Sequence, residues 1–284
     1  MLKDKYDITF FFPAIRTNLW LGVYESLKKS CKKYNWEILF CGPFPLPEEL
    51  QNIENVRNVR EHGNVSRAVQ VGLTHAQGKL IFIGNDDTVY REDAFDAALD
   101  LYNSECGPRD IMQCTYVEQG EKGGEPQPDE YWSVAFHGAF KNLKGIDQTW
   151  KLATEPVMHR SHFFDMGGFD CQWEYMDGST HDFMWRSQRT GSKIVNSPSY
   201  VGDMNWWPAH QGDHGPIHDA MVHHDQALLF SVWATENDRY KINYDNWKEQ
   251  PSVWKRRFPG EVYDSYESLW DGEGYTMDWK PAPQ

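Results

Sequence analysis

The side chains best suited to chemistry are Asn85, Asp86, Asp87 and Thr88, which directly follow the apolar run Leu80–Gly84. Carboxylate oxygens are hard ligands that suit Mg²⁺ or Mn²⁺, and these ions keep positions open for phosphate oxygens. Two adjacent carboxylates point in different directions, so one can hold a metal while the other reaches a ribose or a structural donor. Asn and Asp also favour turns, and the spacing alone therefore also fits a simple turn cap.

A second candidate is Asp182, twelve positions after Asp170 in the GGFD segment at residues 167–170. Asp182 opens a stretch of helical spacing, and a carboxylate at the start of a helix within a pocket can act as a general base. An Asp in that place can also be only the N-cap of the helix. Asp170 and Asp182 together could be the carboxylate pair of a glycoside hydrolase. The residues alone leave these interpretations open.

Histidine supplies a third group of candidate ligands, because six of the eleven histidines lie between residues 181 and 224. His210, His214 and His218 are four positions apart, a spacing that on one helix would stack them like the ligands of a zinc site. Two glycines and a proline within the same stretch interrupt such a helix. A zincin-type site is therefore disfavoured, whereas a single histidine of this group could still reach a metal or a phosphate.

The elements that would position these side chains follow an α/β pattern. Buried strands are expected from apolar runs and helices from apolar stripes at helical spacing. The expected strands cover residues 8–12, 37–41, 56–60, 80–84 and 111–116, and the expected helices about 18–31, 64–76 and 91–102. This order predicts a Rossmann-like, mostly parallel sheet flanked by helices. Such sheets bind ligands beyond the carboxyl ends of their strands, where Asp86 and Asp87 fall.

Composition and charge limit the class of protein. The chain has 284 residues, 40% of them hydrophobic, which is typical of a folded protein. Its net charge is −14, and the first 60 residues hold nine basic and seven acidic side chains, so the acidic excess lies beyond them. A nucleic-acid binder needs a basic footprint, so nucleic acid is an unlikely partner.

Cysteine usage and hydropathy indicate where such a chain works. The five cysteines are odd in number and have no repeated spacing, so they do not form a disulfide framework. We find neither a signal peptide nor an apolar run long enough to span a membrane. The sequence therefore predicts a soluble, cytoplasmic protein.

Taken in order, these motifs resemble those of the inverting nucleotide-sugar glycosyltransferases of family 2, which have the GT-A fold. The resemblance covers roughly residues 7–230. It rests on the opening strand with Pro13, the segment 64–76 leading into LIFIGNDDT, and GGFD followed by THDFMWR. It implies a domain with a nucleotide-sugar-binding half at 1–104 and an acceptor-binding half at 105–234. Residues 235–284 would form an acidic C-terminal extension rich in Trp and Tyr.

The resemblance also implies roles for single residues. Asp87 matches the residue that binds the divalent metal, Asp86 the residue near the ribose, and Asp182 the catalytic base. Asn85 replaces the first Asp of the family's metal motif, and His214 falls in a loop that closes over the donor, as a candidate metal or phosphate ligand. Further donor contacts are expected from Pro13, Arg16 and Arg67, although surface solvation fits both arginines equally well.

The predicted function is metal-dependent, inverting transfer of a sugar from a UDP-, GDP- or dTDP-sugar to an acceptor hydroxyl, with Mn²⁺ or Mg²⁺ as cofactor. The expected acceptor is a glycan or glycoconjugate, as in polysaccharide biosynthesis. The alternatives are a metal-independent glycoside hydrolase and a non-catalytic carbohydrate-binding protein, the latter favoured by the 13 Trp residues. A transferase acting on modified DNA is disfavoured by the acidic charge.

Overall fold

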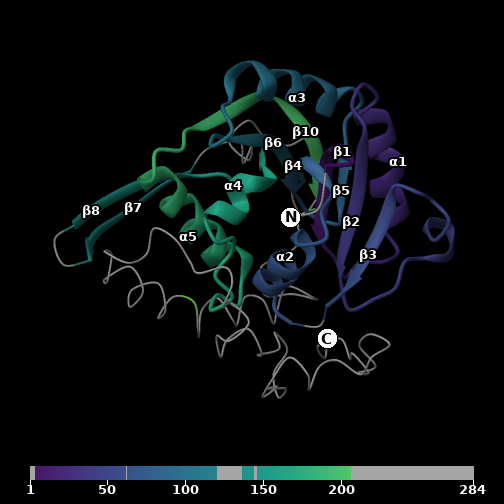
Figure 1. The fold of residues 1–284 in the computed structure, drawn as a ribbon, viewed down its shortest axis with the longest axis horizontal. Coiled ribbons are helices and arrows are strands. Elements are labelled where there is room, and N and C mark those ends of the chain that lie inside the picture. Colours follow the sequence, from purple (N-terminus) through teal and green to yellow (C-terminus); the bar gives the residue numbers. More distant parts are fainter. Residues whose placement is uncertain (1–3, 62, 120–135, 144–145, 206–224, 226–284) are drawn as a thin grey trace.

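The computed structural model describes residues 4–61, 63–119, 136–143, 146–205 and 225 (Figure 1). The strands are β1 (Tyr6–Pro13), β2 (Trp36–Gly42), β3 (Val56–Arg60), β4 (Gly78–Ile83), β5 (Thr88–Tyr90), β6 (Ile111–Gln119), β7 (Phe136–Leu143), β8 (Ile146–Leu152), β9 (Pro156–His159) and β10 (Ile194–Asn205). The helices are α1 (Trp20–Ser30), the short 3₁₀ helix η1 (Glu48–Leu50), α2 (Val65–Leu73), α3 (Ala94–Glu105), α4 (Arg160–Asp165) and α5 (Met176–Arg189).

One eight-stranded sheet runs through the described residues, in the order β3-β2-β1-β4-β9-β6-β10-β5. The pairs β3–β2, β2–β1, β1–β4 and β6–β10 are parallel. β9 runs antiparallel to both β4 and β6, and β5 runs antiparallel to β10. The carboxyl ends of β1, β2 and β4 therefore meet at one edge of the sheet, next to the start of β9.

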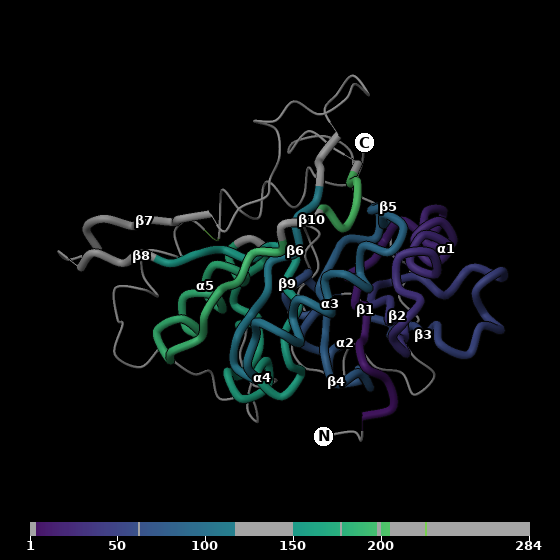
Figure 2. The backbone as a smooth tube through the Cα atoms, turned by 90° about the horizontal axis from the view of Figure 1, so that it is seen from above, coloured from purple at the N-terminus to yellow at the C-terminus, as the bar shows by residue number. Residues whose placement is uncertain are grey.

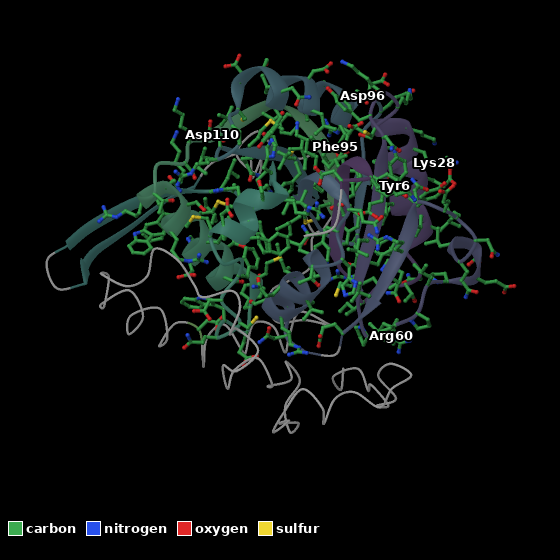
Figure 3. The ribbon with its side chains drawn as sticks, in the orientation of Figure 1. Tyr6, Lys28, Arg60, Phe95, Asp96 and Asp110 are labelled. Carbon is green, nitrogen blue, oxygen red and sulfur yellow. The ribbon has the colours of Figure 1, made fainter. Side chains whose placement is uncertain are left out.

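Helices cover both faces of this sheet and enclose two apolar layers. On one face, α1 and α3 contribute Trp20, Leu27 and Phe95, and on the other α2 and α5 contribute Val69 and Phe183. In Figure 1, α1 and α3 lie along the top and right of the sheet, with α2, α4 and α5 on the opposite side. The labelled side chain of Phe95 lies inside the molecule, whereas that of Asp96 lies at its margin (Figure 3).

The side chains of β1 contribute to the apolar layers on both faces of the sheet. Phe10 and Phe12 belong to the layer under α1 and α3, and Phe11 belongs to the layer under α2. All three rings are fully buried, because successive side chains of a strand point to opposite faces. The continuous apolar run in the sequence is therefore the signature of a strand that is buried on both sides.

β7 and β8 form a separate antiparallel hairpin that extends away from the sheet in Figure 1, and Figure 2 shows α5, which contacts β8, at the other end of the sheet from β3. Trp150 at the end of β8 is buried and donates a hydrogen bond from its indole N–H to Nδ1 of His181, at 3.2 Å. The side-chain amide of Gln188 donates to the carbonyl of Lys151 at 2.7 Å. The base of the hairpin is thus fixed to α5.

The predicted fold class and the predicted order of the first elements are confirmed. Two details differ. The strand expected at residues 111–116 is β6, and β9 and β10, which were not expected, also belong to the sheet. α1 begins at Trp20, two residues after the expected start at residue 18, and α2 is capped by Asn64, which accepts from the backbone N–H of Arg67 at 2.7 Å.

The remaining physical expectations concern cysteines and membranes. All five cysteines lie in the described part of the chain and none forms a disulfide. Among the described residues, no helix is long and apolar enough to cross a membrane. Residues 235–284, the predicted C-terminal extension, lie outside the described residues.

Candidate functional site

Asn85, Asp86 and Asp87 follow directly after β4, at the edge where the parallel strands end. This confirms their predicted position in the fold. The segment after β1, which starts beyond Pro13 and contains Arg16, passes over the same edge because it is hydrogen-bonded to Asp86. The structure thus brings together five of the eight predicted site residues.

Asp86 serves as the anchor of the segment after β1. Its Oδ2 accepts hydrogen bonds from the backbone N–H groups of Ile15 and Arg16, both at 2.7 Å, and from the indole N–H of Trp20 at 3.1 Å. Its Oδ1 accepts from Nη1 of Arg16 at 2.7 Å. A carboxylate has about four acceptor positions, so Asp86 is committed to holding this loop. Its predicted contact with a ribose stays a prediction.

Asp87 lies beside the anchor and shares its arginine. Oδ2 of Asp87 is 3.6 Å from Nη1 of Arg16, and the Arg16 side chain keeps 16% of its surface exposed. Of the two adjacent carboxylates, Asp86 therefore binds structural donors, as expected for one of the two, and Asp87 lies next to the partly exposed guanidinium of Arg16. A guanidinium fork suits a diphosphate, so the position of Arg16 fits the contact predicted for it.

Glu155 is a member of this region that the sequence did not reveal. It precedes β9, and the antiparallel pairing of β9 with β4 places it opposite the end of β4. Its Oε1 accepts from Nδ2 of Asn85 at 3.1 Å. Burial raises the pKa of Glu155 to about 8, the charge of Asp87 acts in the same direction, and the hydrogen bond from Asn85 opposes it. The only possible sequence signal was a lone acid before a short strand.

The second predicted site surrounds the turn at Gly167 and Gly168, which adopt φ values of 85° and 70°. Gln70 of α2 donates to the carbonyl of Gly167 at 3.0 Å and accepts from the N–H of Phe169 at 2.8 Å. Arg186 of α5 donates to the carbonyls of Met166 and Gly168 at 2.6 and 2.7 Å. The turn is therefore held between two helices.

Asp182 is a correction to the predicted geometry, because it lies in the middle of α5 rather than at its start. Its Oδ2 is 2.9 Å from Nε of Arg186, and both side chains have 0% exposure. Asp182 thus orients the arginine that binds the turn. A general base must reach the acceptor hydroxyl, so the catalytic role predicted for Asp182 requires this ion pair to open and stays a prediction.

Arg67 also lies in a buried ion pair. Its Nε is 2.8 Å from Oε1 of Glu61, with 0% exposure of both side chains. The alternative of a solvated surface position is therefore wrong for Arg67, and its predicted diphosphate contact stays a prediction.

The predicted ligand His214 lies outside the described residues. Within the described part of the chain, no group of three or more His, Cys, Asp or Glu side chains is arranged to hold a metal ion. Magnesium and manganese sites that use substrate phosphates and water need only one or two protein carboxylates. The region around Asp87 has the oxygen chemistry for such a site.

Asp225 was not predicted, although it fixes the start of α5. Its two carboxylate oxygens accept from the backbone N–H groups of Glu174 and Tyr175 at 3.0 and 2.9 Å. Negative charge is favourable at a helix N-terminus. The chain beyond β10 therefore returns to the helix that carries Asp182.

Comparison with solved structures identifies the fold. S. aureus TarS 1-349, solved in complex with UDP-GlcNAc, matches with a TM-score of 0.52 and 11% identity, covering 87% of this chain and 70% of that chain. GalNAc-T7, solved with UDP, GalNAc and Mn²⁺, matches with a TM-score of 0.54 and 12% identity, covering 88% of this chain and 56% of that chain. Both are glycosyltransferases of the GT-A type. The chain has the GT-A fold.

Both candidate regions belong to this one fold. The first is Asn85–Asp87 after β4, and the second is the turn at Gly167 and Gly168, which is bound by Gln70 of α2 and Arg186 of α5. Likeness at 11–12% identity establishes the fold and leaves the activity to be argued from the site. No protein-family model matches the sequence, and no curated protein matches it.

Proposed function

We propose that this protein is a metal-dependent glycosyltransferase that transfers a sugar from a nucleoside-diphosphate sugar to an acceptor hydroxyl with inversion at the anomeric carbon. The observation that carries the proposal is the division of labour between Asp86 and Asp87 at the carboxyl edge of β4 in a GT-A fold. Asp86 is committed to the loop after β1. Asp87 lies beside Arg16, in a place suited to a charged ligand.

The donor diphosphate would bind between Arg16 and Asp87. Asp87 would hold the divalent cation, which when bound supplies Lewis-acid stabilisation of the leaving diphosphate. Arg16 would bind a diphosphate oxygen while its other contact to Asp86 keeps the guanidinium in place. Pro13 and Asn85 complete the edge of the proposed donor site. His214 is proposed as a further contact to the cation or the phosphates, and Arg67 as a further contact to the diphosphate.

The proposed base is Asp182, and Asp170 is the alternative. Asp182 would act after its ion pair with Arg186 rearranges on acceptor binding. Asp170 lies on the turn that Arg186 binds, and its two oxygens accept from the backbone and side-chain N–H groups of Gln172 at 2.9 and 3.2 Å. Either carboxylate would take the proton of an acceptor hydroxyl as that oxygen attacks the anomeric carbon.

The donor class to test first is UDP-sugars. TarS was solved with UDP and with UDP-GlcNAc, and GalNAc-T7 was solved with UDP. GDP- and dTDP-sugars remain within the proposal. The proposed acceptor is a glycan or glycoconjugate, which would supply the hydroxyl nucleophile that direct displacement needs.

The deciding experiment is a thermal-shift panel of UDP-, GDP- and dTDP-sugars with and without Mn²⁺, followed by a turnover assay with the best donor. We expect stabilisation by one nucleotide class that depends on Mn²⁺. Full activity in EDTA would contradict metal dependence and favour the hydrolase alternative. Binding of sugars without any binding of nucleotides would instead favour a carbohydrate-binding protein.

A further inference from the structure

The carboxyl group of Glu155 has an unusual environment for a buried acid. The residue has no exposed surface, and its Oε1 is bound by Asn85. Its Oε2 is also buried and has no hydrogen-bond partner among the described residues. Burying a polar atom without a partner is unfavourable, and more so when the group is charged. Such an atom in a native fold therefore points to a ligand that the carboxyl group is arranged to meet.

Other buried oxygens surround Glu155. The hydroxyls of Thr88 and Tyr90 have no partner of regular hydrogen-bonding geometry in the described residues, although they lie near each other. The Tyr90 hydroxyl reaches the end of β4, because a Cβ added to Gly84 would lie 2.9 Å from it. Burial raises the pKa of Tyr90 and the charge of Glu155 acts in the same direction, which indicates that the two side chains lie near each other.

The chemistry of this group favours a cation over an anion. Its members supply carboxyl and hydroxyl oxygens, the hard ligands preferred by Mg²⁺ and Mn²⁺. The charge of Asp87 acts on Glu155, so the two acids lie near each other at the end of β4. Two nearby carboxylates repel each other in a buried site, and a divalent cation between them removes that repulsion.

Asp86, the sequence neighbour of Asp87, is less suited to this task. Its oxygens accept from Ile15, Arg16 and Trp20 and hold the loop after β1. Using Asp86 as a metal ligand would release part of that loop. Glu155 has an oxygen available without breaking any contact.

We propose that Glu155 is the second carboxylate of the divalent-cation site, beside Asp87. The inference rests on the proposed function, because it assigns a new ligand to the cation that the donor would use. The pair joins β4 to the start of β9, so the cation would also tie the parallel part of the sheet to its antiparallel part. Asn85 then acts as a positioning residue that orients the Glu155 carboxylate through its side-chain amide.

The test is Mn²⁺ titration of the full chain by calorimetry in the absence of nucleotide, comparing the wild type with Glu155→Gln. The Gln carboxamide keeps an oxygen that can accept from Asn85 and removes the charge. We expect a loss of Mn²⁺ affinity of about 10- to 100-fold. Asp203→Asn is the matched control, since Asp203 lies on β10 opposite Val89 of β5, is paired with Arg91, and should leave Mn²⁺ affinity unchanged.

Three outcomes would overturn the inference in distinguishable ways. Wild-type Mn²⁺ affinity in Glu155→Gln, together with weaker binding of UDP-GlcNAc, would make Glu155 a contact to the donor instead. A wild type that binds UDP-GlcNAc but no Mn²⁺ would remove the cation site and leave sugar transfer in place. A wild type that binds neither would remove the proposed function as well.

A second measurement covers the case in which Glu155→Gln does not fold. Anomalous diffraction from wild-type crystals soaked in Mn²⁺ should place the ion at metal–ligand distance, about 2 Å, from oxygens of both Asp87 and Glu155. An ion bound by Asp87 alone, or by Asp86 and Asp87, would contradict the assignment.

Discussion

Two Asp–Arg pairs lie at the centre of the two candidate regions, and they differ in the job that the arginine does. Asp86 and Arg16 join segments 70 residues apart, and the arginine side chain stays 16% exposed. Asp182 and Arg186 lie one helical turn apart, and both are fully buried. The first arginine can still meet a ligand, whereas the second already binds two backbone carbonyls.

This difference shows that the same two residue types can form a pair that is available for ligand binding or a pair that only stabilises the fold. A buried ion pair that is removed on one side leaves an uncompensated charge, which is strongly destabilising. A pair whose arginine keeps exposed surface, as Arg16 does, can exchange contacts with an incoming ligand at lower cost. We therefore expect variants of the β4 edge to affect binding first, and variants around Asp182 to affect stability first.

The largest expected effect is that of Asp87→Ala on the first region. Removing the carboxylate should abolish Mn²⁺-dependent nucleotide binding in calorimetry, while thermal unfolding without ligand changes little. Asp203→Ala provides the control, since it removes a partly exposed carboxylate from β10. Unchanged nucleotide affinity in Asp87→Ala would remove this residue from the cation site.

For the second region, Asp182→Ala should lower the free energy of unfolding by about 3–5 kcal/mol, because Arg186 loses its buried partner. Asp182→Asn should cost less, since its carboxamide oxygen still accepts from Nε of Arg186. Urea denaturation measures both values. If Asp182 is also the base, Asp182→Asn lowers turnover by several orders of magnitude with donor binding intact. A near-normal rate would move the base to Asp170.

The second region should also lose stability in mild acid because of His162 on α4. Burial lowers the pKa of His162 to about 4, with the charge of Arg109 adding to the effect. Between about pH 6.5 and 4 the unfolded chain binds a proton that the folded chain does not. The free energy of unfolding therefore falls as pH decreases through this window, by at most about 1.4 kcal/mol per pH unit.

Denaturation of wild type and His162→Gln at pH 7 and pH 4.5 isolates this contribution. The stability difference between the two should shrink as the pH falls. A constant difference would show that His162 does not resist protonation in the folded protein. Donor binding at Asp87 serves as the comparison, since the substitution should leave it unchanged at pH 7.

The smallest expected effect is the difference in stability between Ala variants of two glycines with positive φ. Gly168 has a φ of 70°, and a Cβ there would lie 2.1 Å from Oε1 of Gln70, whereas a Cβ at Gly191, with a φ of 100°, meets no atom within 4 Å. Both Ala variants carry a backbone cost of about 1–2 kcal/mol. Gly168→Ala should cost more, because it also displaces Gln70 from the turn. Equal urea unfolding midpoints for the two Ala variants would contradict a stabilising role for the hydrogen bonds between Gln70 and the turn.

The first region was largely predictable from sequence because its signals are local. An apolar run followed by Asn85-Asp86-Asp87 defines both a strand and the edge where its polar residues lie. The split of tasks between Asp86 and Asp87 was not predictable, since it depends on a loop about 70 residues away returning to donate hydrogen bonds. Glu155 was hidden for the same reason, because only the β4–β9 pairing brings it there.

The second region carried one structural signal that was available from the sequence. Asp182 and Arg186 are at the i,i+4 spacing of a helical ion pair, which already favours a structural partner over a free base. The partner of Arg67 was harder to find, since Glu61 precedes the helix and does not share its periodicity. Helical periodicity thus predicts contacts between two residues of the same helix better than contacts between a helix and the residues that precede it.

The antiparallel seam between β4 and β9 sets an order of events during synthesis. Asn85 and Glu155 are 70 residues apart, so at about 5–20 residues per second the ribosome needs about 4–14 seconds between them. During that interval β1, β2, β3 and β4 are complete and can pair in parallel, but the edge of β4 still lacks its neighbour. A nascent chain can therefore acquire a sheet well before it acquires the complete candidate site.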